Sequence, residues 1–246
     1  MKAIILAAGR GSRMGELTSK LPKCMTVLFN KQLIEWQFLS LNHKAISEIG
    51  IVTGYLKNKF NYKKRYFVNN NWENTNMVSS LLTAIDWLRN DTCIISYSDI
   101  IYEKKIIDQL VKSKGDIVIT YDPKWLSLWE SRFEDPLIDA ENFIIKNGLL
   151  KNIGGKSKKL SSIQGQYMGL IKFSKVGWNK IENFLNKLNK NEIDKIDMTQ
   201  LFKKLLKQGF IVNCIAIDGR WLEVDTKSDL INYQSNYDKT FISDLV

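Results

Sequence analysis

The first apolar stretch of the chain runs directly into a glycine loop that is followed by two cations. Residues 4–8 are typical of a buried strand, and Gly9 and Gly11 come straight after them. Arg13 stands just beyond the second glycine, and Lys23 follows after a short loop. Glycines let backbone N–H groups approach an anion closely, and both cations flank the same loop. The pattern indicates a phosphate site, although an ordinary strand and turn in a basic chain also explains the glycines.

Two aspartates stand where expected strands end. Asp99 follows the stretch 92–97, and Asp225 follows the stretch 221–224. Two carboxylates that converge on a phosphate site suit Mg²⁺, which takes one or two carboxylates together with phosphate oxygens. The alternative is that each aspartate caps a following helix, and Asp225 is well placed to cap a helix at 226–237.

A cluster of charges and aromatic rings lies between residues 123 and 141. Arg132 can pair a carboxylate or a phosphate through two N–H groups. Glu134 and Asp139 can hold an ammonium group, and the ring of Tyr167 can add a cation–π contact. Such a mixed set suits an amino-acid-like zwitterion better than choline, which has no use for an arginine. A solvated loop with internal salt bridges is the alternative.

The strand, the glycine loop and the first lysine together resemble the signature of the nucleotidyltransferases that join NTPs to sugar phosphates and small phospho-alcohols. The matching string is L-A-A-G-x-G-x-R-M at residues 6–14, followed by Pro22-Lys23. The resemblance implies that Arg13 holds the triphosphate, that Lys23 meets the α-phosphate, and that Asp99 and Asp225 hold Mg²⁺. The nucleotide-binding residues that it implies are Leu6, Ala8, Gly9, Gly11, Ser12, Arg13, Asn76 and Ser80.

The chemistry of this family suits the residues that are present. An acceptor phosphate oxygen attacks the α-phosphorus and expels pyrophosphate. Because the second pKa of a phosphate is about 6, this nucleophile is largely ionised at pH 7 and needs no general base. Catalysis then rests on positioning and charge neutralisation by Lys23, Arg13 and Mg²⁺. His43 is the single histidine, and its expected place in a helix away from the loops argues against a catalytic histidine.

Two further segments indicate which branch of the nucleotidyltransferase family the chain resembles. Residues 74–81, rich in asparagine and serine, look like the corresponding turn of the phosphocholine cytidylyltransferase branch, whose donor is CTP. The segments 125–141 and 165–169 resemble the cytidylyltransferases of bacterial capsule phosphoramidate synthesis, which act on L-glutamine phosphate. The resemblance therefore implies CMP transfer from CTP to a small phosphorylated zwitterion during surface-polysaccharide modification. Phosphocholine, 2-aminoethylphosphonate and sugar 1-phosphates remain alternative acceptors.

Expected strands and helices alternate over much of the chain, which predicts an α/β fold. We expect a Rossmann-like three-layer sandwich with a mostly parallel mixed sheet, and ligands beyond the carboxyl ends of its strands. One nucleotidyltransferase domain is expected over 1–246, with an acceptor-side elaboration at about 123–175. The expected strands are 4–8, 48–53, 65–69, 92–97, 116–121, 163–173 and 210–217. The expected helices are 33–44, 77–89, 103–114, 178–188, 198–207 and 226–237, with a hairpin turn at 147–148 and a loop at 154–159.

Charge and composition argue against a nucleic-acid-binding protein and against a membrane protein. The formal charge of +10 suggests an anionic partner, but the chain has no arginine-rich arm and no aromatic RNA-binding signature. We therefore expect CTP and a small acceptor as partners, no nucleic acid, and a homodimer as an open option. No apolar run approaches the ~20 residues of a membrane helix, and no signal peptide precedes the glycine loop, so we expect a cytoplasmic protein without a membrane partner.

Two other types of site are disfavoured by spacing. The third glycine of an NAD-binding G-x-G-x-x-G loop would fall on Met14, and Pro22-Lys23 stands where an acidic residue is needed. Three widely separated cysteines make neither a disulfide framework nor a C-x-x-C metal site. These cysteines are Cys24, Cys93 and Cys214.

Overall fold

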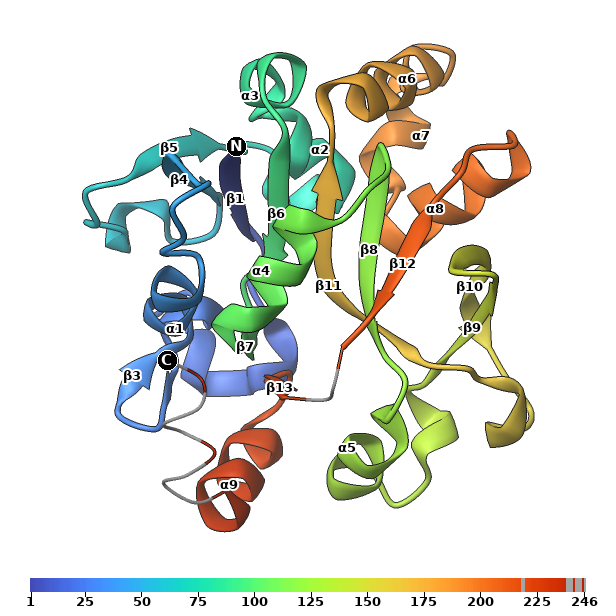
Figure 1. Ribbon diagram of the computed structural model, residues 1–246. Coiled ribbons are helices and arrows are strands. Elements are labelled where there is room, and N and C mark those ends of the chain that lie inside the picture. Colours follow the sequence, from blue (N-terminus) through green and yellow to red (C-terminus); the bar gives the residue numbers. More distant parts are fainter. Residues whose placement is uncertain (218–219, 238–240, 242–244, 246) are drawn as a thin grey trace.

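The computed structural model describes residues 1–217, 220–237, 241 and 245. Within them, nine strands form one mixed sheet in the order β5–β4–β1–β6–β11–β8–β12–β10–β9 (Figure 1). Two small two-stranded sheets accompany it, β7 with β13 and β2 with β3. The strands are β1 (Lys2–Ala7), β2 (Val27–Leu28), β3 (Lys31–Gln32), β4 (Glu48–Thr53), β5 (Arg65–Val68), β6 (Cys93–Tyr97), β7 (Ile100–Tyr102), β8 (Ile117–Asp122), β9 (Glu141–Lys146), β10 (Leu149–Lys156), β11 (Gln166–Phe173), β12 (Asn213–Ala216) and β13 (Trp221–Glu223).

Helices cover both faces of the large sheet. Figure 1 shows α4 in front of the sheet with α1 beside it, while α2, α3, α6, α7 and α8 pack together behind it. At the lower end of the view, α5 and α9 lie side by side. The α-helices are α1 (Leu33–Ser40), α2 (Met77–Leu82), α3 (Ile85–Asn90), α4 (Lys104–Lys112), α5 (Trp125–Arg132), α6 (Lys175–Leu185), α7 (Lys190–Lys195), α8 (Met198–Lys207) and α9 (Lys227–Asn236). Short 3₁₀ turns are η1 (Ser12–Thr18), η2 (Lys23–Met25), η3 (Lys57–Lys59), η4 (Trp72–Asn74), η5 (Pro136–Ile138) and η6 (Leu160–Ser162).

Local sequence explains where these elements begin. The central strand β1 is apolar on both sides, as a strand covered by helices on both faces must be, and Ala3, Ile4 and Ile5 are fully buried. The last helix, α9, begins with a capping box in which Thr226 and Asp229 satisfy each other's backbone N–H groups. The helix N-cap is therefore Thr226, so Asp225 remains free for another role.

The sheet divides into a parallel and a largely antiparallel half. β5, β4, β1 and β6 run parallel to one another, whereas β11 is antiparallel to both of its neighbours, β6 and β8. The register of β11 against β8 shifts between Tyr167 and Ile171, and the positive φ of Gly169 (83°) marks this bulge. A Cβ at Gly169 would come within 2.7 Å of the Tyr97 ring, so the glycine makes room for that ring.

A short strand pair brings the two aspartates of the sequence analysis together. β7 and β13 are antiparallel, with Ile100 opposite Glu223. The N–H of Val224 also donates to the carbonyl oxygen of Asp99 at 2.9 Å. Asp99 and Asp225 therefore lie beside each other, although they are 126 positions apart in the sequence.

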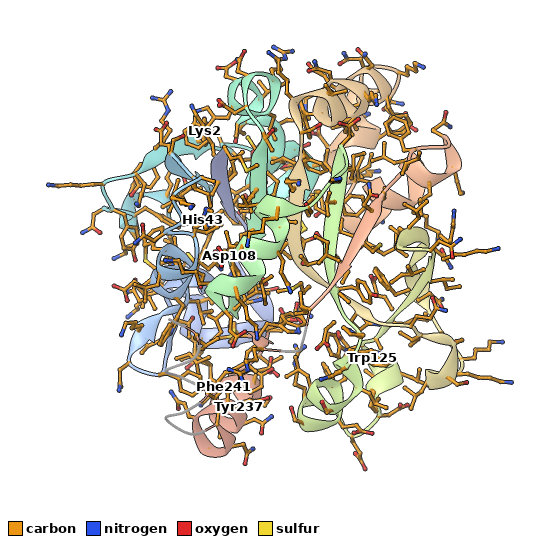
Figure 2. The ribbon with its side chains drawn as sticks, in the orientation of Figure 1. Lys2, His43, Asp108, Trp125, Tyr237 and Phe241 are labelled. Atoms are coloured by element: carbon orange, nitrogen blue, oxygen red, sulfur yellow. The ribbon has the colours of Figure 1, made fainter. Side chains whose placement is uncertain are left out.

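A buried amide fixes the turn that carries Asp99. The side-chain nitrogen of Gln37, on α1, donates to the carbonyl oxygens of Tyr97 and Ile100, both at 2.8 Å. These two carbonyls flank the turn that carries Asp99, which is thus tied to a helix of the front layer. Figure 2 shows His43 and Asp108 next to each other on that layer, where the Nε2 of His43 lies 3.0 Å from the Asp108 carboxylate. The expected helix 33–44 ends at Ser40, so His43 lies in the connection between α1 and β4 and not inside a helix.

Several expected elements differ from the structure, and α7 lies in a stretch to which no element was assigned. The expected helix 77–89 is two helices, because the hydroxyl of Thr83 donates to the Ser80 carbonyl and the backbone of Ala84 leaves the helical region (φ −98°, ψ 24°). The expected loop 154–159 begins inside β10, since Gly154 and Gly155, both at positive φ, form a bulge that lets the strand continue to Lys156. The stretch 123–141, left without assigned elements, contains α5, η5 and the start of β9.

Candidate active site

The glycine loop after β1 packs directly against Lys23. Gly11 has a positive φ of 66°, and a Cβ at this position would lie 2.7 Å from both the Cβ and the Cδ of Lys23. Only glycine accommodates that conformation and that contact without strain. The hydroxyl of Thr18 donates to the carbonyl oxygens of Gly11 and Gly15, which closes the loop. The expected glycine loop and its lysine are therefore one packed unit.

The ammonium group of Lys23 bridges the two aspartates. Its Nζ lies 2.7 Å from Asp99 Oδ2 and 2.6 Å from Asp225 Oδ1. Arg13 reaches the same Asp225 oxygen at 3.0 Å, with its own side chain largely exposed. The structure thus brings together the four residues that the sequence analysis assigned to phosphate and metal binding.

The charges in this cluster are mutually stabilising. Burial by itself lowers the pKa of Lys23, but Asp99 and Asp225 outweigh it and the pKa is raised, so the ammonium stays charged. Burial by itself raises the pKa of Asp225, yet Lys23, Arg13 and Arg132 lower it below the ordinary value. The Asp225 carboxylate is therefore ionised at neutral pH, as a ligand of a divalent cation must be.

The donor set suits a magnesium ion that arrives with a polyphosphate. Asp99 Oδ1 is buried and has no hydrogen-bond partner among the described residues. The described residues contain no group of three or more His, Cys, Asp or Glu side chains that could hold a metal ion, so Asp99 and Asp225 form a two-carboxylate set. Mg²⁺ is commonly bound in this way, with phosphate oxygens and water completing its shell. A cation already occupies the space between the carboxylates, namely the Lys23 ammonium.

Two cavities meet at this cluster. The first, of about 280 Å³, contains every nucleotide-binding residue that the sequence analysis named, together with Trp72, Thr75 and Ser98. The second, of about 320 Å³, extends from Asp225 toward β9 and α8. Arg13, Met77 and Asp99 line both cavities. The two cavities therefore adjoin at these shared residues.

A hydrogen-bond network supports the wall of the first cavity. The buried amide of Asn69 donates to the hydroxyl oxygens of Thr75 and Ser80, at 2.8 and 3.0 Å. The backbone N–H of Asn76 donates to the carbonyl oxygen of Asp194, on α7, at 2.7 Å. Asn76 and Ser80 therefore line the cavity from a turn that α7 holds in place.

The second cavity is acidic and aromatic. Its acidic side chains, besides Asp99 and Asp225, are Asp139, Glu141, Asp197 and Glu223, and its rings are Tyr97, Trp129 and Tyr167. Burial, and next the charge of Asp197, raise the pKa of Glu141, which shows that negative groups are crowded here. Arg13 is the one basic side chain among its lining residues. The cavity is therefore suited to a ligand with a positive group at the end remote from the phosphate site.

Two of the four residues expected to bind the acceptor line the second cavity, and two do not. Asp139 and Tyr167 line the second cavity, as expected. Glu134 is exposed and is not among the lining residues. Arg132 lies behind Asp225 instead of facing the cavity, with its side chain 0 % exposed and its N–H groups on Glu223, Asp225 and Asp229. The expected contact between Arg132 and an acceptor carboxylate does not fit this arrangement, because the guanidinium is enclosed by carboxylates of its own chain.

Several residues that line the second cavity were assigned no role in the sequence analysis. Glu141, Gln166, Asp197 and Thr199 all line the second cavity, and Trp129 donates from its Nε1 to Asp139 at 3.0 Å. Asp197 also caps α8 by accepting from the N–H of Gln200. The pattern Asp-x-x-Gln predicts only such a cap, so no local signal distinguishes it from an ordinary helix start.

The three cysteines take no part in the site, and none of them is in a disulfide. Burial raises the pKa of the Cys24 thiol to about 12, so it stays protonated although Lys23 is adjacent in sequence. Among the described residues, no helix combines the length and the apolar composition that a bilayer crossing requires.

Comparison with known proteins identifies the family. The chain belongs to the MobA-like NTP transferase family, whose domain matches residues 3–143. It is 36 % identical to CTP:phosphoglutamine cytidylyltransferase of Campylobacter jejuni, over 94 % of this chain and 98 % of that protein. It is also 28 % identical to choline-phosphate cytidylyltransferase of Streptococcus pneumoniae, over 83 % of this chain and 96 % of that protein.

Solved structures support the same fold. The inositol-1-phosphate CTP transferase of T. maritima superposes with a TM-score of 0.75 at 15 % identity, covering 99 % of this chain and 95 % of that one. The expected fold class, a Rossmann-like nucleotidyltransferase sandwich, is confirmed. The expected enzyme class is confirmed as well: the protein is a nucleotidyltransferase, and both relatives agree with the expectation of a cytidylyltransferase.

Proposed function

We propose that this protein transfers CMP from CTP to a small phosphorylated zwitterion, preferably L-glutamine phosphate, and releases pyrophosphate. The observation that carries the proposal is the pair of adjoining cavities, one built around the glycine loop and one acidic, with Lys23, Asp99 and Asp225 at their junction. The similarity to CTP:phosphoglutamine cytidylyltransferase over nearly the whole length of both chains supports the choice of donor and acceptor.

The residues at the junction can supply positioning and charge neutralisation for the transfer. An acceptor phosphate oxygen attacks the α-phosphorus of CTP, and the bond to the β-phosphate oxygen breaks to release pyrophosphate. The attacking phosphate is ionised near neutral pH and needs no base, which agrees with a site whose charged groups are lysine, arginine and carboxylates. Lys23 is placed to neutralise charge at the α-phosphate, and the exposed Arg13 can reach the departing phosphates.

A magnesium ion is the cofactor that we propose. Asp99 and Asp225 would hold it, and when bound it would neutralise phosphate charge and orient the triphosphate. Lys23 must then exchange at least one carboxylate partner for a phosphate oxygen. The buried and unpartnered Oδ1 of Asp99 supports this assignment, because a buried carboxylate oxygen without a partner costs free energy that a cation would offset.

The acidic cavity favours an acceptor with an ammonium group that donates hydrogen bonds. Asp139, Glu141 and Asp197 supply several acceptor oxygens beside three aromatic rings. A primary ammonium can satisfy these oxygens through its N–H groups, whereas the methylated nitrogen of choline cannot. A sugar 1-phosphate brings no positive charge. The cavity therefore supports an acceptor with a primary ammonium over phosphocholine and hexose phosphates. The choice of L-glutamine phosphate over 2-aminoethylphosphonate rests on the similarity to CTP:phosphoglutamine cytidylyltransferase.

One screen tests donor and acceptor together. Pyrophosphate release is measured with CTP, UTP, GTP and dTTP against L-glutamine phosphate, phosphocholine, 2-aminoethylphosphonate and glucose 1-phosphate, with and without Mg²⁺. We expect the highest kcat/KM for CTP with L-glutamine phosphate, and no turnover once the metal is chelated. Faster turnover with another nucleotide would overturn the assignment of CTP as donor, and a preference for glucose 1-phosphate would overturn the assignment of a zwitterionic acceptor.

We propose that the reaction serves surface-polysaccharide modification from within the cytoplasm.

A further inference from the structure

Three cations contact Asp225, namely Arg13, Lys23 and Arg132, and the side chain of Arg132 is the most deeply buried of the three. Arg132 ends α5, and its guanidinium lies near the rings of Trp129 and Phe133, with its central carbon 5.3 and 5.0 Å from their centroids. Arginine side chains are rarely buried unless they are paired. This one is paired with three carboxylates, all within residues 223–229.

The guanidinium uses its donors in three directions. Nη1 donates to Glu223 at 2.7 Å, Nη2 to Asp225 Oδ2 at 3.3 Å, and Nε to Asp229 Oδ1 at 3.1 Å. A planar fork of fixed donors can hold several carboxylates in one relative orientation, which the single point charge of a lysine cannot do. The three acids therefore have a defined arrangement that depends on Arg132.

The two carboxylate oxygens of Asp225 have different partners, one on the side of Arg132 and one on the side of the active site. Its Oδ2 faces Arg132, while its Oδ1 faces Lys23 and Arg13. The contact with Arg132 thus selects the rotamer that presents Oδ1 to the phosphate site. Glu223 and Asp225 also repel each other, and the guanidinium provides the positive charge that keeps both close to the site.

Arg132 also fixes the backbone of Asp225, through the carboxylate of Asp229. The Oδ2 atom of Asp229 accepts from the N–H groups of Asp225 and Thr226, both at 2.8 Å. Arg132 holds that same carboxylate through Oδ1. Both the side chain and the main chain of Asp225 are therefore fixed by the arginine, directly in one case and through Asp229 in the other.

We propose that Arg132 is a positioning residue that orients Asp225 Oδ1 toward the metal and the nucleotide. The proposal rests on the proposed function in one respect, since it takes Asp225 as a ligand of the metal that accompanies the nucleotide. It assigns α5, a helix of the acceptor-side segment, to the construction of the phosphate site. Residues that support metal ligands from behind typically change metal affinity or activity by about 10- to 100-fold when they are removed.

The test measures binding without turnover. The affinity of α,β-methylene CTP is determined by calorimetry with and without Mn²⁺, for the parent protein, Arg132→Lys, Arg132→Gln and Asp229→Asn. We expect both Arg132 variants to weaken binding of the Mn²⁺-loaded analogue by about 10-fold or more, while the affinity of the metal-free analogue changes less than about twofold. Asp229→Asn, which leaves Asp225 and Arg132 in place, should lower the Mn²⁺-dependent affinity in the same direction by a smaller factor.

Controls separate this role from others. Arg89→Gln removes an exposed ion pair with Glu182 far from the site and should leave both affinities unchanged. Circular dichroism identifies any variant that does not fold, in which case Arg132→Lys and Asp229→Asn decide the question. Unchanged Mn²⁺-dependent affinity in a folded Arg132 variant overturns the proposal, and so does a rise in acceptor KM with normal metal-dependent binding. If the parent protein binds the Mn²⁺-loaded analogue but transfers CMP to no acceptor, the acceptor assignment fails while the positioning role stands.

Discussion

The two cavities of the site are assembled in different ways. The nucleotide side comes from a few continuous stretches: the end of β1 with its glycine loop, the turn from Trp72 into α2, and the turn after β6. The acceptor side draws single residues from many elements, including α5, β9, β11, α8 and β13. A wall made of one loop can be recognised from residue spacing, whereas a wall made of single residues depends on the whole fold.

This difference has a consequence for function. Backbone geometry and one lysine define the nucleotide side, so a change there affects the reaction with every acceptor. Side-chain charge defines the acceptor side, so a change there alters which acceptor is used. The following variants test whether the two sides are separable in this way.

The largest effect is expected at Lys23. Lys23→Ala removes the ammonium that contacts both aspartates, and loss of a preorganised charged partner typically lowers kcat by about 10²- to 10³-fold. The loss should be the same for L-glutamine phosphate and for phosphocholine, as measured by pyrophosphate release. Lys20→Ala, at an exposed position on the same loop, is the control and should retain parental kcat. An Lys23→Ala enzyme within a few-fold of the parent would remove the lysine from catalysis.

A smaller and more selective effect is expected at Asp197. Asp197→Asn removes one negative charge from the acceptor cavity while an amide oxygen can still cap α8. The KM for L-glutamine phosphate should rise about 10-fold, which corresponds to loss of one charge-assisted hydrogen bond of about 1.4 kcal/mol, and the KM for CTP should not change. Glu134→Gln, outside the cavity, should change neither constant. Equal rises for acceptor and CTP would show that the two sides are not separable.

Gly11 and Gly15 form a contrasting pair on the nucleotide side. Both have positive φ, but Gly11 has a left-handed backbone with ψ 48°, whereas the ψ of −128° at Gly15 is open essentially to glycine alone; only at Gly11 would an added Cβ meet Lys23. Gly11→Ala should therefore raise the KM for CTP more than Gly15→Ala does, whereas Gly15→Ala should lower the free energy of unfolding through backbone strain without a contact to Lys23. Chemical denaturation and steady-state kinetics measure the two effects. Identical behaviour of both variants would mean that the contact with Lys23 does not matter.

The smallest effect is expected at Asp116, which precedes β8 at the end of that strand opposite to the site. The hydrogen bond from Lys180, followed by that from Ser174, lowers the pKa of Asp116. A carboxyl whose folded pKa is lowered stabilises the protein above its unfolded pKa and loses this contribution as pH falls through the folded value. Asp116→Asn should cost a few tenths of a kcal/mol at pH 7 and nothing at about pH 2, as followed by thermal unfolding. Kinetics should stay parental, and a difference that persists at acid pH would assign the effect to packing.

Sequence reasoning succeeded where a residue's role is written in its neighbours. Asp99 and Asp225 each follow apolar residues of a strand, which predicted that both carboxylates lie near the glycine loop. The structure brings them together through the small antiparallel pair β7–β13, and not at the edge of the large sheet. Arg132 shows the limit of this reasoning. Nothing near Arg132 in sequence indicates that three acids from the other end of the chain will enclose it. Its charge indicated an ionic partner, but only tertiary structure decides whether the partner is a ligand or the protein itself.

The break between α2 and α3 has a similar cause. The apolar periodicity of residues 77–89 favours one helix, and each half does bury apolar residues, Val78 and Leu81 in α2 and Trp87 and Leu88 in α3. The interruption comes from hydroxyl groups at Ser80 and Thr83, which bond to Asn69 and to the local backbone. A residue that serves the nucleotide wall thus overrides local helix propensity.

The buried Gln37 gives the two aspartates different kinds of support. Its uncharged amide holds both carbonyls that flank the turn of Asp99, so the support of that turn does not depend on any protonation state. The support of Asp225 comes from the guanidinium of Arg132 and the carboxylate of Asp229. Neutral hydrogen bonds therefore set the position of Asp99, whereas charged groups set the position of Asp225. The charge that a bound ligand brings thus enters the balance of forces on Asp225 but not on the Asp99 turn.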